Sequence, residues 1–86
     1  MRVVFHKRFD KSYGRCPPKI REQFKARLGI FLEEPFYPLL ENHALHGEWA
    51  DFRSINITGD YRALYHYLED DIVEFFIIDT HSNLYE

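Results

Sequence analysis

Two turns in the second half of the chain are too short for anything but antiparallel strand pairing. Residues 52–57, 61–68 and 72–78 are rich in aromatic and β-branched side chains, which is typical of strands. The linkers between them, residues 58–60 and 69–71, contain three residues each. Because a parallel crossover needs about a dozen residues or more, each linker must close a hairpin. The sequence therefore predicts a three-stranded antiparallel meander.

The first half of the chain predicts one strand and two helices. Residues 2–6 are expected to form the strand, and residues 9–13 a short helix that ends before two consecutive prolines. Proline is well placed in the first turn of a helix, so the next helix is expected over residues 18–34, followed by a loop over residues 35–47. Its apolar side chains recur at helical spacing on one face: Ile20, Phe24, Leu28, Phe31 and Leu32. The pattern predicts a single α+β domain, residues 1–86, of order β-α-α-β-β-β.

The expected hairpins also predict which side chains meet at one end of the sheet. They pair Arg62 with Asn56 in the strand before it and with Ile78 in the strand after it. A shift of one residue in this register would turn the side chains to the other face. The predicted register gathers four polar side chains at the same end of the sheet, namely Asn56, Asp60, Arg62 and His81.

Composition limits where such a chain acts. Cys16 is the only cysteine, so no internal disulfide can form, and the reducing cytoplasm is the expected location. No apolar stretch approaches the roughly 20 residues that a membrane span needs, so no membrane is expected as a partner. The first residues of the chain do not resemble a signal peptide.

Charge is divided sharply along the chain. Residues 1–27 hold nine of the eleven Lys and Arg but two of the fourteen Asp and Glu, which gives +7, whereas residues 28–86 carry −10. A basic segment of this kind indicates a nucleic-acid surface, although the solvated faces of two helices would explain the same count. If RNA binds, the expected contacts are Lys19, Lys25 and Arg27 of the long helix, with Arg53 of the meander.

Three motifs in residues 42–86 resemble one family. Asn-His-Ala-Leu-His-Gly (42–47) precedes the meander, Gly-Asp-Tyr-Arg-Ala-Leu-Tyr (59–65) opens its second strand, and Thr-His-Ser-Asn-Leu-Tyr (80–85) follows its third. Together with the order of elements, these motifs resemble the RelE/ParE toxin superfamily, and within it the YafQ-like branch. The resemblance covers the whole chain and implies a RelE-like fold with both helices packed on one face of the sheet.

This resemblance implies the toxin of a type II toxin–antitoxin system, with a cognate antitoxin as its protein partner. It further implies cleavage of mRNA on the ribosome, without a metal or other cofactor, by attack of the RNA 2′-hydroxyl on the adjacent phosphate. The reaction requires a base for the 2′-hydroxyl, an acid for the leaving 5′-oxygen and a cation near the phosphate.

The motif positions supply a candidate for each role. His81 matches the C-terminal histidine of the family and is the expected general acid. His43 and Asp60 match two further positions, and either residue could act as the base or orient it. Arg62 matches the arginine that steadies the phosphate, a task that suits a bidentate guanidinium. Tyr85 matches the closing aromatic residue, which can stack on a base or pack beside the acid.

Other roles stay open for the same residues. Arg62 could be a cross-strand partner of Asp60 or Glu74, and aspartate in a glycine-containing turn often serves local hydrogen bonding. Imidazole also ligates zinc, so a metal site is an alternative, although the loop His-x-x-His is a weak signal. The histidines that would form it are His43, His46 and His81.

Two departures from the branch pattern leave the activity open. Asn56 stands where the branch has a histidine, and Ile77 where it has an arginine. Asn56 can hydrogen-bond a phosphate but cannot transfer a proton, and the loss of a cation would slow the reaction by about 10²–10³-fold. Two alternatives follow: a catalytically weakened homologue that mainly pairs with its antitoxin, or a ParE-type module that inhibits gyrase without catalysis. The ParE branch lacks the closing Thr-His pattern.

Overall fold

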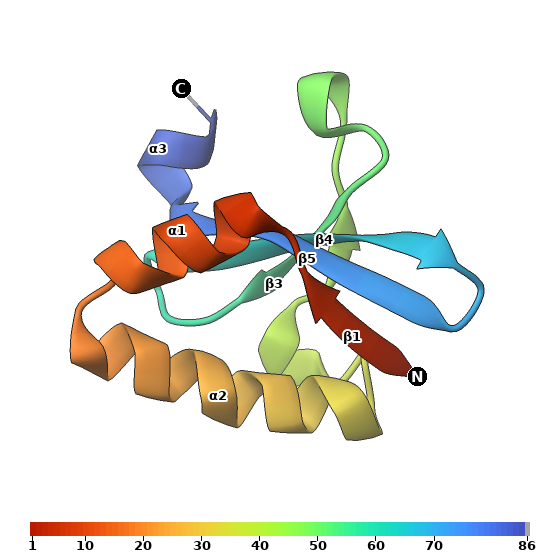
Figure 1. The fold of residues 1–86 in the computed structure, drawn as a ribbon, viewed down its shortest axis with the longest axis horizontal. Helices are drawn as coiled ribbons and strands as arrows, with labels where there is room; N and C mark the ends of the chain where they lie inside the picture. Colours follow the sequence, from red (N-terminus) through yellow and green to blue (C-terminus); the bar gives the residue numbers. More distant parts are fainter. Residues whose placement is uncertain (86) are drawn as a thin grey trace.

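A computed structural model describes residues 1–85, and these residues form one five-stranded mixed sheet (Figure 1). The strands are β1 (Arg2–Phe5), β2 (His43–Ala44), β3 (Arg53–Asn56), β4 (Tyr61–Glu69) and β5 (Ile72–Thr80). They lie in the order β1-β5-β4-β3-β2; β1 runs parallel to β5, and the other pairs are antiparallel. The predicted meander is confirmed, and β2 is a short strand within the segment predicted as loop.

Three α-helices and two single-turn 3₁₀ helices complete the fold. They are α1 (Lys7–Arg15), α2 (Pro18–Glu33), η1 (Pro38–Leu40), η2 (Gly47–Trp49) and α3 (His81–Tyr85). The prediction for α2 is confirmed to within one residue. α1 is longer than predicted at both ends; its earlier start follows from His6, which caps it with Nδ1 accepting a hydrogen bond of 3.0 Å from the Arg8 amide. In the part of the chain that the structure describes, no helix combines the length and apolar character needed to cross a membrane.

The larger core lies between the sheet and the helices α1 and α2. Its centre is a group of aromatic rings in mostly tilted or edge-to-face contact: Phe9, Phe24, Phe31, Tyr65 and Phe75. Leu32 was expected on the apolar face of α2, but it lies outside this core, with 46% of its surface exposed. Consecutive helical residues project about 100° apart, so Phe31 and Leu32 cannot both point at the centre of one narrow stripe.

A smaller core lies on the opposite face of the sheet. Its buried members are Leu45, Leu64 and Leu84, surrounded by Trp49, Phe52 and Ile77. The indole Nε1 of Trp49 donates a hydrogen bond of 3.2 Å to the carbonyl oxygen of Leu84. Figure 1 shows α3 and the η2 segment on the side of the sheet away from α2. Residues 81–85 are therefore packed against the sheet as α3, a helix that periodicity did not predict.

A β-bulge changes the register that the turns predict between β4 and β5. The predicted register holds over residues 65–67, where Tyr65 lies opposite Phe75, but next to the turn Glu69 lies opposite Ile72. It then shifts by one residue, so Arg62 lies opposite Asp79, one residue beyond its predicted partner. The prediction is wrong at this end because each irregularity in the pairing shifts the register that turn length alone would set. The other predicted pair, Asn56 with Arg62, is confirmed.

The extra residue of the bulge is Phe76. Its ring contacts those of Trp49 and Phe52, and the neighbouring Ile77 packs against the same smaller core. Strict alternation along a strand would send one of these two neighbours to the other face. The bulge therefore places two consecutive apolar side chains of β5 in the smaller core.

Arg27 ties α2 to the end of β3. Its Nη1 donates hydrogen bonds to the carbonyl oxygens of Asn56 at 2.8 Å and of Leu39 at 3.3 Å. The predicted polar face of α2 contains Arg27 together with Lys19 and Lys25, but only the two lysines are exposed. Arg27 is partly buried because carbonyl groups at a strand end and in a turn come within reach of its long side chain.

Replacing Arg27 should show this structural role. Arg27→Gln should lower the free energy of unfolding by about 1–3 kcal/mol, because two carbonyl groups lose a charged donor. Lys25→Gln is the matched control, since it removes the same charge from the same helix but breaks only a 3.4 Å surface contact with Glu22. Exposed pairs of this kind contribute about 0–1 kcal/mol. Equal midpoints of the two variants in chemical denaturation would contradict the role.

Candidate functional site

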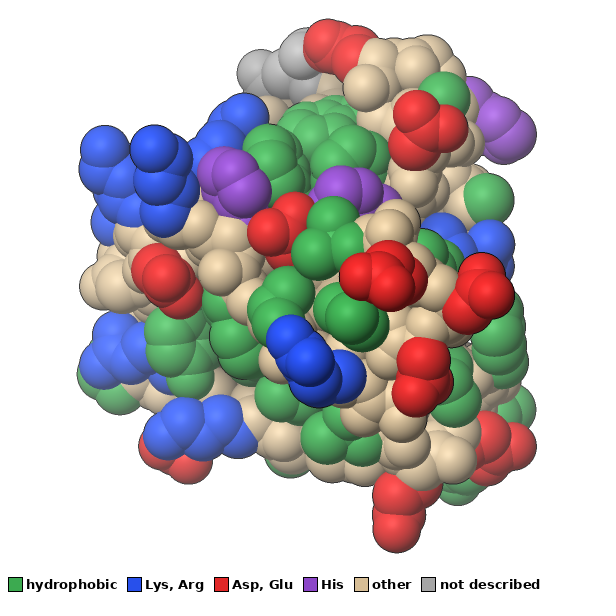
Figure 2. Space-filling view, turned by 45° about the vertical axis from the view of Figure 1, so that its right-hand side comes forward, with side chains coloured by type: hydrophobic (Ala, Val, Ile, Leu, Met, Phe, Trp, Pro, Cys, Tyr) green, Lys and Arg blue, Asp and Glu red, His purple; other side chains and the backbone are tan. Residues whose placement is uncertain are grey.

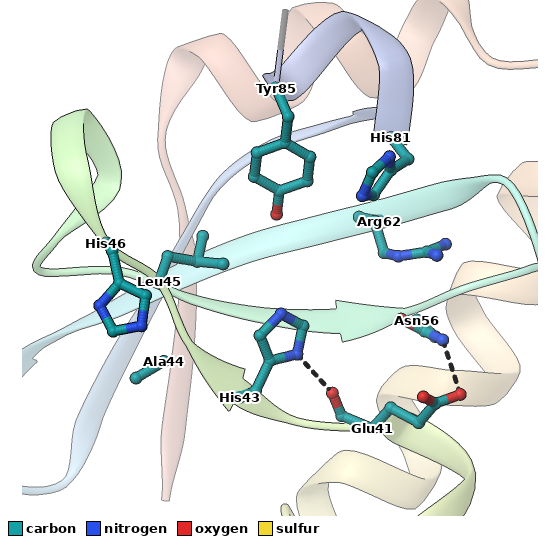
Figure 3. A pocket seen from close by; sticks show the side chains of 9 residues that line it. All are labelled: Glu41, His43, Ala44, Leu45, His46, Asn56, Arg62, His81 and Tyr85. Atoms are coloured by element: carbon teal, nitrogen blue, oxygen red, sulfur yellow. Dashed lines mark hydrogen bonds between the residues drawn. The ribbon is translucent and has the colours of Figure 1, made fainter.

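An open pocket of about 450 Å³ lies at one end of the sheet, where the segments around β2, β3, β4 and α3 meet (Figure 3). Five of the predicted site residues line it, namely His43, Asn56, Arg62, His81 and Tyr85. The other lining residues are Glu41, Ala44, Leu45 and His46. Side chains from four separate segments of the sequence therefore meet in one concave surface.

His81 is the first residue of α3. Thr80 caps this helix, with its Oγ1 accepting a hydrogen bond of 3.2 Å from the Asn83 amide. The His81 amide donates a hydrogen bond of 2.8 Å to the carbonyl oxygen of Asp60, which joins the start of α3 to the turn between β3 and β4. Its imidazole lies 4.6 Å from the Tyr85 ring, one helical turn further on. Both side chains border the pocket from above in Figure 3.

His43 enters the pocket from β2, on the side away from α3. Its Nδ1 lies 2.8 Å from the carbonyl oxygen of Glu41. Because a carbonyl oxygen can only accept a hydrogen bond, Nδ1 carries the proton, and the Nε2 of the neutral imidazole is then an acceptor. Figure 3 shows the ring of His43 pointing toward the centre of the pocket. The hydrogen bond to Glu41 therefore sets the tautomer that can take up a proton from a ligand.

Arg62 and Asn56 lie opposite each other on β4 and β3. Nη1 of Arg62 donates hydrogen bonds to the carbonyl oxygens of Thr58 at 3.0 Å and of Tyr61 at 3.1 Å, which anchor the guanidinium to the turn. Among the described residues that line the pocket, Arg62 is the only one with a permanent positive charge. Any anion bound in the pocket would therefore depend mainly on this group.

The structure leaves the Asp60 carboxylate out of the pocket lining. The residue is exposed, and it contributes to the site through its backbone carbonyl, which accepts the hydrogen bond from His81. Within residues 1–85, neither Asp60 nor Glu74 forms the ion pair with Arg62 that the sequence allows. Glu74 instead contacts His66, with 2.7 Å between Oε1 and Nε2.

Asn42 holds the segment that carries His43 against the core. Its Nδ2 donates a hydrogen bond of 2.7 Å to the hydroxyl of Tyr65, a fully buried side chain. Burial raises the pKa of the Tyr65 phenol, so this group stays neutral. The Oδ1 of Asn42 accepts a hydrogen bond of 2.9 Å from Nε of Arg53. Arg53, a predicted RNA contact that does not line the pocket, thus helps to fix the loop.

Glu41 is a pocket residue that sequence reasoning missed. It follows η1 in the left-handed conformation, with φ of 45°, the only positive φ of a non-glycine residue within residues 1–85. Its carboxylate accepts a hydrogen bond of 3.0 Å from Nδ2 of Asn56. No sequence pattern signals this contact, because it joins a turn residue to a strand residue through tertiary structure alone. The pocket consequently contains a negative charge beside Asn56.

The three histidines of the alternative metal site all line this pocket. Within residues 1–85, no three side chains of His, Cys, Asp or Glu come together in a way that could hold a metal ion. His46 lies at the edge of the pocket far from His81 in Figure 3. Both belong to the same pocket lining, but they do not converge on one point.

The fold is similar to solved toxin structures. YafQ from E. coli strain BL21(DE3) is 18% identical, with 100% of each chain covered and a TM-score of 0.83. A chain of the E. coli DinJ-YafQ toxin-antitoxin complex is 20% identical over 98% of this chain and 96% of that chain, with a TM-score of 0.74. A chain of the archaeal RelE-RelB complex from Pyrococcus horikoshii OT3 is 23% identical over 92% of each chain, with a TM-score of 0.71. At these identities the likeness shows the fold, and the predicted RelE-like fold is confirmed.

Sequence comparison assigns the family. No curated protein matches the chain. A family model does, described as the ParE toxin of the type II toxin-antitoxin system parDE, and it covers residues 3–85. This range is nearly the whole chain, so the predicted membership of the RelE/ParE superfamily is confirmed. The chain belongs to the ParE toxin family of type II toxin-antitoxin systems.

Proposed function

We propose that this toxin is an endoribonuclease that cleaves mRNA on the ribosome. One observation carries the proposal: His43 and His81 enter the same pocket from opposite sides, β2 and α3 (Figure 3). Arg62 lies on β4, which is between β3 and β5 in the sheet. A proton acceptor, a proton donor and a cation thus surround one space that an RNA phosphate can enter, and these are the groups that the reaction needs.

The proposed reaction begins at His43. Its Nε2 takes the proton from the RNA 2′-hydroxyl, and the oxygen attacks the adjacent phosphorus. The bond between phosphorus and the 5′-oxygen breaks, and the imidazolium of His81 protonates the leaving oxygen. The products are a 2′,3′-cyclic phosphate and a 5′-hydroxyl. We assign the base to His43 and not to Asp60, because the Asp60 carboxylate does not line the pocket.

Arg62 would stabilise the charge that develops on the phosphate. Its Nη1 is held by carbonyl groups of the turn, which leaves the Nη2 group for a phosphate oxygen. Asn56, opposite it, can donate a further hydrogen bond from its amide. Ile77, which packs against the smaller core, is uncharged and supplies no cation at the position where the YafQ-like branch has an arginine. Charge stabilisation would therefore depend on one arginine.

Further RNA contacts are proposed for Tyr85 in the pocket and, outside it, for the basic N-terminal third. Tyr85, 39% exposed, offers a ring on which a base can stack beside His81. Lys19 and Lys25 are exposed on α2. Further exposed cations of α1 enlarge this surface, namely Lys7, Arg8, Lys11 and Arg15. On the face shown in Figure 2, Lys and Arg gather toward the left edge and most Asp and Glu lie on the right.

We further propose that the chain pairs with a cognate antitoxin and acts in the cytoplasm, where ribosomes are found. The family is defined by such toxin–antitoxin systems, and the similar E. coli and Pyrococcus proteins were solved as DinJ-YafQ and RelE-RelB complexes. The antitoxin would block mRNA cleavage until it is removed.

A gyrase inhibitor of the ParE type is the second candidate function, because the matching family model is named for ParE. Inhibition of gyrase without catalysis would give no role to His43 and His81, which line the pocket. A catalytically weakened toxin is the third, and Asn56 and Ile77 favour it, since both replace groups that the branch uses.

Expression of the toxin without an antitoxin separates the three candidates. Induced alone in a bacterial host, the chain should stop growth, and reporter mRNA should show cuts within translated codons, because His43, His81 and Arg62 form a complete set of catalytic groups. Primer extension on the reporter detects the cuts. Intact mRNA with stalled gyrase would establish the ParE-type activity, and normal growth would establish the weakened toxin.

Replacing His81 should remove activity without unfolding the protein. His81→Gln should slow mRNA cleavage by about 10²–10⁴-fold, the usual contribution of a general acid. The side chain is exposed, so the free energy of unfolding should change by less than about 0.5 kcal/mol. Single-turnover cleavage on programmed ribosomes and the thermal midpoint are measured together. His66→Gln is the reverse control: it loses a half-buried contact with Glu74 and should lower the midpoint but keep cleavage.

A substitution of His43 can remove the proposed base, Nε2, and keep the structural hydrogen bond that Nδ1 donates. In His43→Asn the new amide can still donate to the Glu41 carbonyl oxygen in place of Nδ1, but nothing stands at the position of Nε2. Cleavage should fall by about 10²–10⁴-fold with an unchanged thermal midpoint. Cleavage within a few-fold of the unmodified toxin would exclude His43 as the base.

A further inference from the structure

The acidic residue of the pocket stands where an anionic ligand is expected. The Asn56 amide is a hydrogen-bond donor opposite Arg62, and a donor beside a guanidinium is a favourable place for a phosphate oxygen. In this structure the amide donates to Oε2 of Glu41 at 3.0 Å (Figure 3). The carboxylate of the protein thus takes the position that a phosphate oxygen would take.

The backbone of Glu41 is held on both sides in an unfavourable conformation. A φ of 45° is uncommon for a residue with a Cβ atom, and such residues persist where their surroundings fix them. The Glu41 amide donates a hydrogen bond of 3.1 Å to the carbonyl oxygen of Pro38, and its own carbonyl oxygen accepts one of 2.8 Å from His43. These two bonds fix the backbone of Glu41 at the edge of the pocket, and the hydrogen bond from Asn56 holds its carboxylate there.

We propose that Glu41 is an intramolecular competitor of RNA: its carboxylate occupies the phosphate position of the pocket and lowers the affinity of the free toxin for RNA. The chemical nature of the ligand rests on the proposed function. An RNA phosphate must displace the carboxylate from Asn56 and overcome its repulsion. Glu41 is exposed, so its side chain can swing outward without disturbing the core. The ribosome, which presents mRNA at a high effective concentration, compensates for this competition.

The test compares two substitutions of Glu41 with a matched control. Glu41→Gln removes the charge and keeps the size, whereas Glu41→Gly removes the side chain and adopts φ of 45° without steric cost. Both keep the backbone carbonyl that binds His43. Glu33→Gln removes the same charge from the exposed end of α2, outside the pocket lining. The probe is a fluorescent single-stranded 2′-O-methyl RNA, which has no free 2′-hydroxyl and cannot be cleaved.

Fluorescence anisotropy at low salt gives the affinities. Both Glu41 variants should bind the RNA at least about fivefold more tightly, the effect of removing a like charge about 4 Å from a phosphate even in water-like surroundings. Glu33→Gln should gain less than about twofold because of screening. In an Asn56→Ala background, Glu41→Gln should lose most of its gain, since the carboxylate is then no longer held at the phosphate position and can already turn outward.

An affinity of Glu41→Gln equal to that of Glu33→Gln would overturn the proposal. So would weaker binding, which would make the carboxylate an RNA contact, or no binding by any variant. Cleavage on programmed ribosomes is measured with the same proteins. Tighter binding without cleavage would refute the endoribonuclease function and keep the competition, and cleavage without tighter binding would refute only the competition.

Discussion

The pairing of β4 with β5 is the interaction on which the rest of the structure depends. Tyr65 and Phe75 are fully buried on the side of α1 and α2, and Leu64 is fully buried on the other side. A sheet with two apolar faces requires a layer on each, and a buried large apolar side chain contributes about 1.5–3 kcal/mol. The two long helices cover one face. The other is covered because residues 81–85 fold back as α3 and η2 brings Trp49 over the sheet.

The site follows from this second layer. Leu84 is buried because the smaller core needs its side chain, and the helix that carries Leu84 begins at His81. His43 reaches the same pocket because β2 is the strand next to β3 in the sheet, with Asn42 bonded to the buried Tyr65. The two histidines, although far apart in the sequence, thus line one pocket because packing holds the segments on both sides of it.

Much of the fold could be predicted from local patterns, and the failures share one cause. Turn length and β-propensity identified the meander, and helical spacing with Pro18 identified α2. The register failed after the bulge at Phe76, whose position depends on how the smaller core is filled. α3 has five residues, too few for a periodic signal. Motif likeness found most of the pocket residues, but the outward Asp60, the inward Arg27 and Glu41 depend on side-chain directions that only tertiary contacts decide.

Because α3 has only five residues, its stability depends on contacts with the rest of the protein. A helix of five residues is not stable by itself, and α3 is held to the sheet mainly by the burial of Leu84 and the hydrogen bond from Trp49. Its opening would require much less free energy than unfolding of the aromatic core under α1 and α2. The positions of His81 and Tyr85 in the pocket therefore depend on these few tertiary contacts and not on the helix itself.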